Sequence, residues 1–172
     1  MISLPTAVSD LFNLINSPDA QEAYHGFTWL RLTIEKHTQG RHNDPHYAEL
    51  RMADELAAVR LTDSQLNKMV DMLFAIVDQH QDKATQAVWC LSKTFDDVVI
   101  HRILAMLDES WYRDDKLTAE VIRAAYDIKL LRSHWDLIER IAREGMPESR
   151  YAALQMLAIR RRLQNRIPRA DH

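Results

Sequence analysis

Apolar residues recur along most of the chain at intervals of three and four positions rather than two. This spacing gathers them on one side of an α-helix, which completes a turn in about 3.6 residues. The chain has only three glycines and no Asn-Gly or Asp-Gly pair, so it lacks the usual sequence of a tight β-hairpin turn. The pattern therefore predicts an all-α protein of about nine helices.

Start and stop signals divide this pattern into helices. Ser17 and Pro18 are typical of the first positions of a helix, and Thr62 with Gln65 matches a capping box. The stretch DKATQAVWCLSKTFDDVVIHRILAMLDES, residues 82–110, contains two short helices separated by TFDD, and neither can bury its apolar side alone. Further helices are expected over residues 4–15, 17–40, 46–59, 62–79, 117–131, 133–144 and 148–163.

The longer apolar helices repeat with a fixed period, because the interval from Met69 to Ile103 equals the interval from Ile103 to Leu137. Their core positions form three triplets at this spacing: Met69, Val70 and Leu73; Ile103, Leu104 and Leu107; Leu137, Ile138 and Ile141. Between them lie helices whose apolar side is rich in small residues: Ala84, Ala87, Val88 and Leu91; Val121, Ala124, Ala125 and Ile128; Ala153, Leu154 and Leu157. One helical hairpin per period is typical of an α-solenoid, in which each hairpin covers the apolar side of its neighbour. An ordinary helical bundle with accidental periodicity is the alternative.

Three segments carry a resemblance to a known family. DKATQAVWCL and PESRYAALQML resemble the second helix of HEAT-type repeats, and DDVVIHRILAMLDE resembles the first helix of the following repeat. Tetratricopeptide repeats have a similar period, but their Trp-x-x-Leu-Gly signature is missing, since no glycine lies between Gly40 and Gly145. The resemblance covers about residues 62–163. It implies a right-handed HEAT-like α-solenoid forming one domain, with residues 1–60 as N-terminal capping helices and 164–172 as a basic tail.

In HEAT-like stacks the small-residue helices line a concave face. The residues expected on that face, outside the core, are Gln86, Trp89, Lys93, Arg123, Tyr126, Asp127, Tyr151 and Gln155. Trp, Tyr and Arg dominate the binding energy of protein interfaces, although these aromatic side chains would equally serve to cover seams between helices. The sequence therefore favours a non-enzymatic protein-interaction module, such as an adaptor or a specific inhibitor of the immunity-protein type, that binds one partner on this face.

Charge is distributed unevenly and suggests an alternative partner. Residues 132–172 hold nine arginines and five acidic residues, whereas positions 1–131 hold 13 basic and 20 acidic side chains. A nucleic-acid-binding or nucleic-acid-processing solenoid would use the C-terminal arginines to contact phosphates: Arg160, Arg161, Arg162 and Arg166. The net charge of −3 makes nucleic acid the less favoured partner.

The histidines raise a metal-site hypothesis. The candidate ligands are Glu22, His25, His37, His42, Asp44 and His46. A metal-dependent helical enzyme would use His25, His42 and His46, but their spacing is not a strong zinc or di-iron pattern. Histidines in a polar surface loop are also usually only solvated. We therefore expect no metal and no other cofactor.

Other enzymatic signatures are missing. The chain has no Gly-x-Ser-x-Gly elbow and no glycine-rich phosphate loop, and Cys90 stands in the middle of an apolar helix, where packing is its expected role. A single cysteine excludes an internal disulfide, and the sequence shows neither a signal peptide nor an apolar run long enough to cross a bilayer. These features predict a cytoplasmic protein that does not span a membrane.

Overall fold

The computed structural model describes residues 8–38, 61–79, 81–110 and 113–166, and every regular element within them is a helix. This part of the chain contains eight α-helices of at least eight residues, compared with the nine or so expected along the whole sequence. A single turn, α7 (Leu107–Ser110), follows the fifth of them. The helix expected over residues 46–59 lies outside the described residues. The all-α prediction is confirmed, and none of the described helices is long and apolar enough to cross a bilayer.

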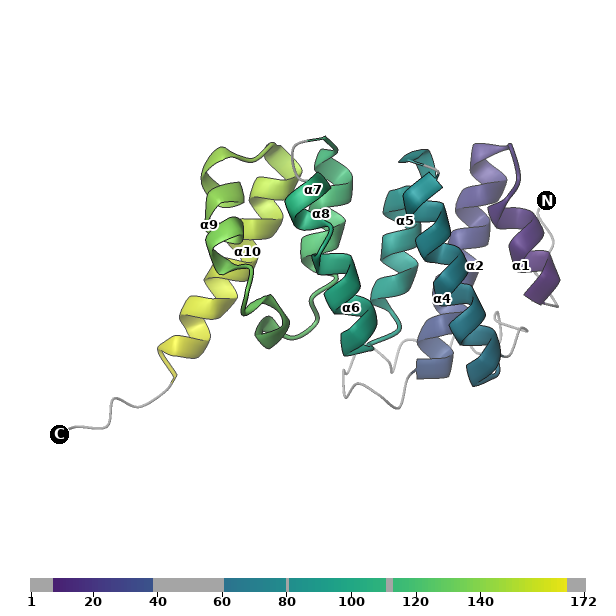
Figure 1. Cartoon of the computed structure of the whole chain (residues 1–172), viewed down its shortest axis with the longest axis horizontal. Coiled ribbons are helices and arrows are strands. Elements are labelled where there is room, and N and C mark those ends of the chain that lie inside the picture. The colour runs from purple at the N-terminus through teal and green to yellow at the C-terminus, as the bar shows by residue number, and fades with distance from the viewer. Residues whose placement is uncertain (1–7, 39–60, 80, 111–112, 167–172) are drawn as a thin grey trace. The chain divides into compact units, whose positions relative to one another are not determined.

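Contacts divide the chain into two compact units, Met1–Val99 and Ile100–His172. Among the described residues of the first unit, the helices labelled in Figure 1 are α1 (Val8–Ile15), α2 (Ala20–Thr38), α4 (Asp63–Gln79) and α5 (Gln81–Ser92). Helix α1 packs on α2, and α5 packs on both α2 and α4. Helix α6 (Asp97–Leu104) crosses the boundary between the units. The sequence predicts that the chain forms one repeat domain and that its helices form a solenoid. Both points remain predictions.

Helices α1 and α2 approach each other closely at Gly26. A Cβ atom at this position would lie 2.8 Å from both the backbone nitrogen of Ile15 and the Cβ of Leu14. The end of α1 is tied to α5 as well, because the Lys83 ammonium donates to the carbonyl oxygens of Ile15 at 2.9 Å and Ser17 at 3.2 Å. The lack of a side chain at residue 26 therefore sets the distance between the first two helices.

One helix start is confirmed and one is corrected. Thr62 and Gln65 form the predicted capping box, since each side chain accepts the backbone N–H of the other residue. Helix α2 begins later than expected, because the carboxylate of Asp19, and not Ser17, accepts the first free N–H groups, those of Gln21 and Glu22.

The second unit is built around its last helix. Besides α7 it contains α8 (Asp115–Arg123), the 3₁₀ turn η3 (Ile128–Leu131), α9 (Trp135–Glu144) and α10 (Pro147–Gln164). Helix α10 packs on α8, on α9 and on η3, and α7 packs on α8. The sequence wrongly predicts one helix over residues 117–131. Helix α8 ends at Arg123, and Asp127, in an extended conformation, starts η3 by accepting the backbone N–H of Lys129.

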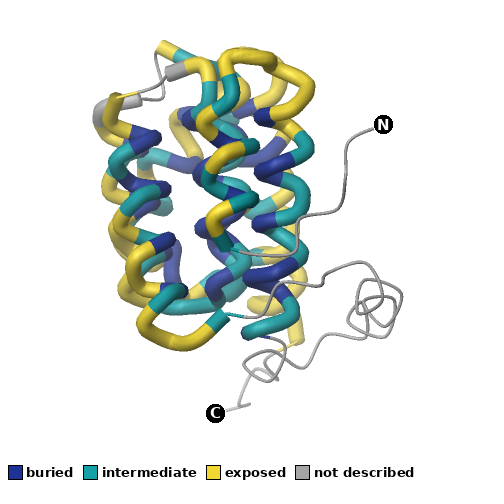
Figure 2. The backbone as a smooth tube through the Cα atoms, turned by 90° about the vertical axis from the view of Figure 1, so that its right-hand side faces the viewer, coloured by how far each residue is buried: buried dark blue, intermediate teal, exposed yellow. Residues whose placement is uncertain are grey.

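The core follows the predicted columns with a few differences. Buried positions recur turn by turn along the helices and alternate with exposed ones (Figure 2). Met69, Ile103 and Ile138 are fully covered or nearly so, while Val70 and Leu137 are only half-buried. Leu154 was expected in the core and is 50% exposed, because α10 turns Ser149, Ala152 and Ala153 inward instead.

Candidate functional site

Three of the predicted partner-binding residues lie on or just after α5, beside α2. The Arg31 guanidinium of α2 covers the ring of Trp89, with 4.5 Å between its central carbon and the ring centroid. The ammonium of Lys93 lies 3.8 Å from the carboxylate of Glu35, and Gln86 is half-buried with its side-chain oxygen enclosed. These side chains take part in the α2–α5 interface, so they do not form a freely exposed surface.

A nearly buried ion pair holds this interface together. Arg31 donates to Glu35 at 2.8 Å, and the Glu35 side chain is only 5% exposed. Charges with so little water around them are costly unless paired, because burial removes their hydration. The second carboxylate oxygen of Glu35 and the Nε of Arg31 have no hydrogen-bond partner among the described residues. The arrangement fixes α2 against α5.

Cys90 faces the same interface and has no catalytic setting. Its side chain is fully buried, and its sulfur lies 3.3 Å from the carbonyl oxygen of Phe27. Burial raises the pKa of this thiol far above its ordinary value, outweighing the nearby cations Arg31 and Lys93. A neutral, enclosed thiol is a poor nucleophile, as expected for a packing residue.

The other predicted residues of this set lie in the second unit and do not share one helix. Arg123 is at the end of α8, 3.9 Å from Glu120, while Tyr126 and Asp127 follow in the turn before η3. Tyr151 and Gln155 are exposed on α10. The assignment of Tyr126 and Asp127 to a helix surface was wrong, because the helix ends before them.

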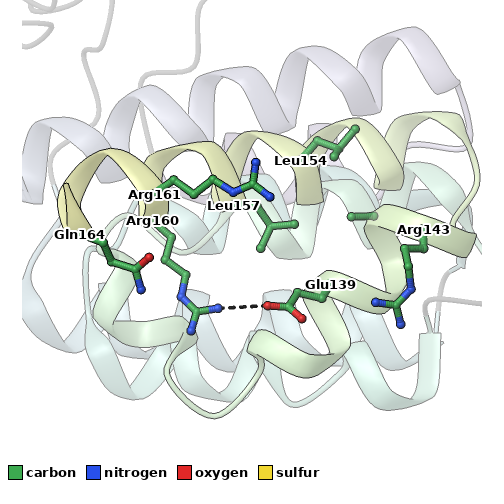
Figure 3. A pocket seen from close by; sticks show the side chains of 8 residues that line it. Glu139, Arg143, Leu154, Leu157, Arg160, Arg161 and Gln164 are labelled. Carbon is green, nitrogen blue, oxygen red and sulfur yellow. Dashed lines mark hydrogen bonds and ion pairs between the residues drawn. The ribbon is translucent and has the colours of Figure 1, made fainter.

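A groove beside α10 is a marked surface feature of the second unit. Its first hollow, of about 570 Å³, lies between α9 and α10 and is drawn in Figure 3. It is lined by Glu139, Ala142, Arg143, Leu154, Leu157, Arg160, Arg161 and Gln164. A second hollow, of about 500 Å³, is lined by Ile128, Lys129, Arg132, Trp135, Arg160, Leu163 and Gln164. Because Arg160 and Gln164 line both, the two hollows are adjacent, and together we name them the C-terminal groove.

Arg160 occupies the boundary between the two hollows. Its guanidinium lies over the ring of Trp135, 4.5 Å from the centroid, and donates to the carboxylate of Glu139 at 3.3 Å. Figure 3 shows this contact reaching from α10 to α9. The Arg160 and Glu139 side chains are 33% and 48% exposed, so water screens the pair and its net contribution to stability is small.

The charge of the groove is strongly one-sided. Five cationic side chains line it, and Glu139 is the single carboxylate among the lining residues. Arg143 and Arg161 in the first hollow, and Lys129 and Arg132 in the second, form no ion pair with a carboxylate in the part of the chain that the structure describes. Apolar side chains, including Leu157 of the first hollow, alternate with these cations. Such a surface suits a ligand that is both acidic and apolar.

The C-terminal arginines proposed for phosphate binding are exposed but point in different directions. Arg161, Arg162 and Arg166 are exposed, and Arg160 is half-buried by Trp135 and Glu139. Consecutive helical residues are about 100° apart around the axis, so Arg160, Arg161 and Arg162 cannot form one row. Only the first two of these three line the groove.

The metal-site hypothesis gains no support from the described residues. Within them no three His, Cys, Asp or Glu side chains are close enough to hold a metal ion. His37 contacts Asp63 at 2.8 Å, and His25 lies edge-on to Tyr24. His42, Asp44 and His46 lie outside the residues described.

Comparison of the chain with known protein families, with curated proteins and with solved structures found no match. Only the geometry and charge of the groove therefore indicate what it binds. The sequence predictions named Arg160 and Arg161 but missed Arg143, Trp135 and Leu163. The sequence does contain a signal for an exposed apolar surface on the last helix. This helix has more large apolar residues than fit on its alanine-rich buried side.

Proposed function

We propose that this chain is a non-enzymatic protein-interaction module that binds one partner protein through the C-terminal groove. The observation that carries the proposal is the exposure of α10. Large apolar side chains stand open along it: Tyr151, Leu154, Ile159 and Leu163, exposed by 42% to 60%. Of these, Leu154 and Leu163 line the C-terminal groove, and apolar surface beside a charged rim is typical of protein-binding sites on soluble proteins. An adaptor or a specific inhibitor of the immunity-protein type, in a reducing cytoplasm, fits such a surface and the single buried cysteine.

The HEAT-like solenoid remains part of this proposal. Support comes from the paired packing of α1 with α2, α4 with α5 and α9 with α10, and from the burial of Met69 and Ile103 at equivalent positions of successive periods. A rigid hairpin stack presents its surface side chains already ordered, so that little conformational entropy is lost when a partner binds.

Nucleic acid is the alternative partner and is less well supported. Surfaces that bind nucleic acid are polar and strongly basic, whereas apolar side chains form much of the C-terminal groove. Base stacking needs an open aromatic face, and Arg160 already covers one face of Trp135. Phosphate contacts would make binding fall steeply with salt concentration, so a salt titration separates the two functions.

Three forms of the full chain test the proposal. Each form is immobilised to capture the partner protein, and its binding to the purified partner is then measured by calorimetry. The double variant Leu154→Asp/Leu163→Asp places charge in the groove at exposed positions, so folding is preserved. The matched control is Val98→Asp on α6, which is also exposed and apolar. We expect a protein retained by the wild type and by the control but not by the double variant. Equal binding to all three forms would disprove the proposed site.

A further inference from the structure

We infer that the segment bound in the C-terminal groove is an acidic amphipathic helix of the partner protein. This inference rests on the proposed function and specifies the chemistry of the partner. Two features of the groove carry it: the charge of its rim and the spacing of its apolar hollows.

The rim selects for acidic side chains. Arg143 and Arg161 line the first hollow, and Lys129 and Arg132 line the second, all four exposed and without a carboxylate partner among the described residues. A basic segment would be repelled by them, and a neutral one would leave them unpaired as water is excluded. Carboxylates placed opposite these cations give both attraction at a distance and specificity.

The apolar hollows select for a helix. Leu154 and Leu157 mark the first hollow and Leu163 marks the second. Leu157 and Leu163 lie three positions before and after Arg160, so they are about 9 Å apart along the axis of α10 and about 60° to either side of Arg160. Two apolar residues seven positions apart on a partner helix are separated by about 10 Å and lie on the same side, so one helix fills both hollows. A peptide with only one apolar anchor would fill one of them.

Arg160 separates the hollows and is held by a contact that an acidic ligand replaces. Its pairing with Glu139 is exposed, so a carboxylate from the partner competes for the guanidinium at little cost. Glu139 is at the same time the one group in the groove that repels an acidic ligand. Removing its charge should strengthen binding, whereas a purely structural Arg160–Glu139 pair would give no such gain.

The test uses a synthetic helical peptide of about 18 residues, with leucines at positions i, i+3 and i+7 and glutamates beside them, titrated into the full chain by fluorescence anisotropy. A peptide with lysine in place of each glutamate, and one with the same composition but scrambled leucines, serve as peptide controls. The protein variants are Arg143→Glu/Arg161→Glu and Glu139→Gln. Arg162→Glu is the matched control, because Arg162 is exposed on the same helix and lines neither hollow.

We expect the acidic peptide to bind with an affinity that falls about tenfold or more in Arg143→Glu/Arg161→Glu, rises about twofold to threefold in Glu139→Gln, and is nearly unchanged in Arg162→Glu. Equal binding of the lysine or scrambled peptide would overturn the inference. So would tighter binding of a single-stranded oligonucleotide that depends on Arg162. If a partner protein is lost on Leu154→Asp/Leu163→Asp substitution but contacts the groove through a non-helical or basic segment, the proposed function stands and this inference fails.

Discussion

The carboxylate of Asp115, at the start of α8, accepts the backbone N–H of Ser149 in α10 at 2.7 Å and that of Glu148 at 3.0 Å. The first N–H groups of a helix have no partner within it, so they need an acceptor from elsewhere. Here a neighbouring helix supplies the acceptor, because the residue at the N-cap position of α10 is Met146, which makes no side-chain cap. Asp115 thus joins two helices that are far apart in the sequence.

We predict that Asp115→Ala lowers the free energy of unfolding by about 1–2 kcal/mol, the usual cost of losing a helix cap. Urea denaturation followed by circular dichroism measures the loss. Asp108→Ala is the control, since Asp108 is exposed on α7 and no hydrogen bond from it is found among the described residues. Equal losses in the two variants would show that the contact with α10 is not stabilising.

The same carboxylate makes stability depend on pH. Burial alone would raise the pKa of Asp115, but the N–H groups of Glu148 and Ser149 outweigh it and lower the pKa below its ordinary value. A carboxyl group with a lowered pKa in the folded state stabilises above its unfolded pKa of about 3.9, and this stabilisation is lost as pH falls through the folded pKa. The difference in unfolding free energy between wild type and Asp115→Asn should therefore shrink from about pH 6 to about pH 3. A difference that stays constant over this range would contradict the assignment.

Gly26→Ala should destabilise the first unit although alanine favours helices. The exchange gains about 1 kcal/mol in helix propensity, but the new Cβ would lie 2.8 Å from the backbone of Ile15, and overpacking of this kind costs about 1–3 kcal/mol. We expect a net loss of up to about 2 kcal/mol in urea denaturation. Gln21→Ala, at an exposed position of the same helix, controls for propensity and should not destabilise. A more stable Gly26→Ala variant would show that α1 moves away without cost.

Removing Glu35 should cost more than removing an exposed acid of the same kind. Glu35→Ala leaves the largely covered Arg31 and the nearby Lys93 without their counter-charge, so we expect a loss of about 2–3 kcal/mol. The matched control is Glu144→Ala, which breaks an exposed pair with Arg140 and should cost less than about 0.5 kcal/mol. Similar losses in both variants would mean that the α2–α5 ion pair is fully screened by water.

Cys90 should be unreactive in the folded protein. Burial raises the pKa of its thiol, so at neutral pH it is protonated as well as enclosed. A chromogenic disulfide reagent should label it slowly in buffer and rapidly in urea. Rapid, stoichiometric labelling of the native chain would contradict the burial of this side chain.

Much of the local structure could be predicted because it depends on neighbouring residues. Helical periodicity gave the all-α class, and the Thr62–Gln65 capping box gave the start of α4, since both partners of the box lie within one turn. The early end of α8 was missed because Ala124 and Ala125 favour a helix, while the competing signal is the short side chain of Asp127, which caps the next turn.

The candidate site was harder to predict because it depends on which side of each helix is covered. Trp89 was expected to contact a partner, but Arg31 covers its ring, and the periodicity of α5 says nothing about a cation on α2. For α10 the sequence pattern indicated Leu154 as a core residue, whereas the buried side is formed by Ala152 and Ala153. A difference of one or two positions in the buried face of a helix therefore decides whether a leucine packs in the core or lines the groove.

The buried residues of α10 are confined to its first half, between Ser149 and Ala153. Helices in proteins are held mainly by tertiary packing, so the segment from Leu154 to Gln164 is supported far less than the segment before it. Its backbone amides should exchange with deuterium sooner than those at the start of the helix, and a bound partner should slow that exchange. Deuterium exchange of each backbone amide in the second half of α10 would thus show directly whether the groove is occupied.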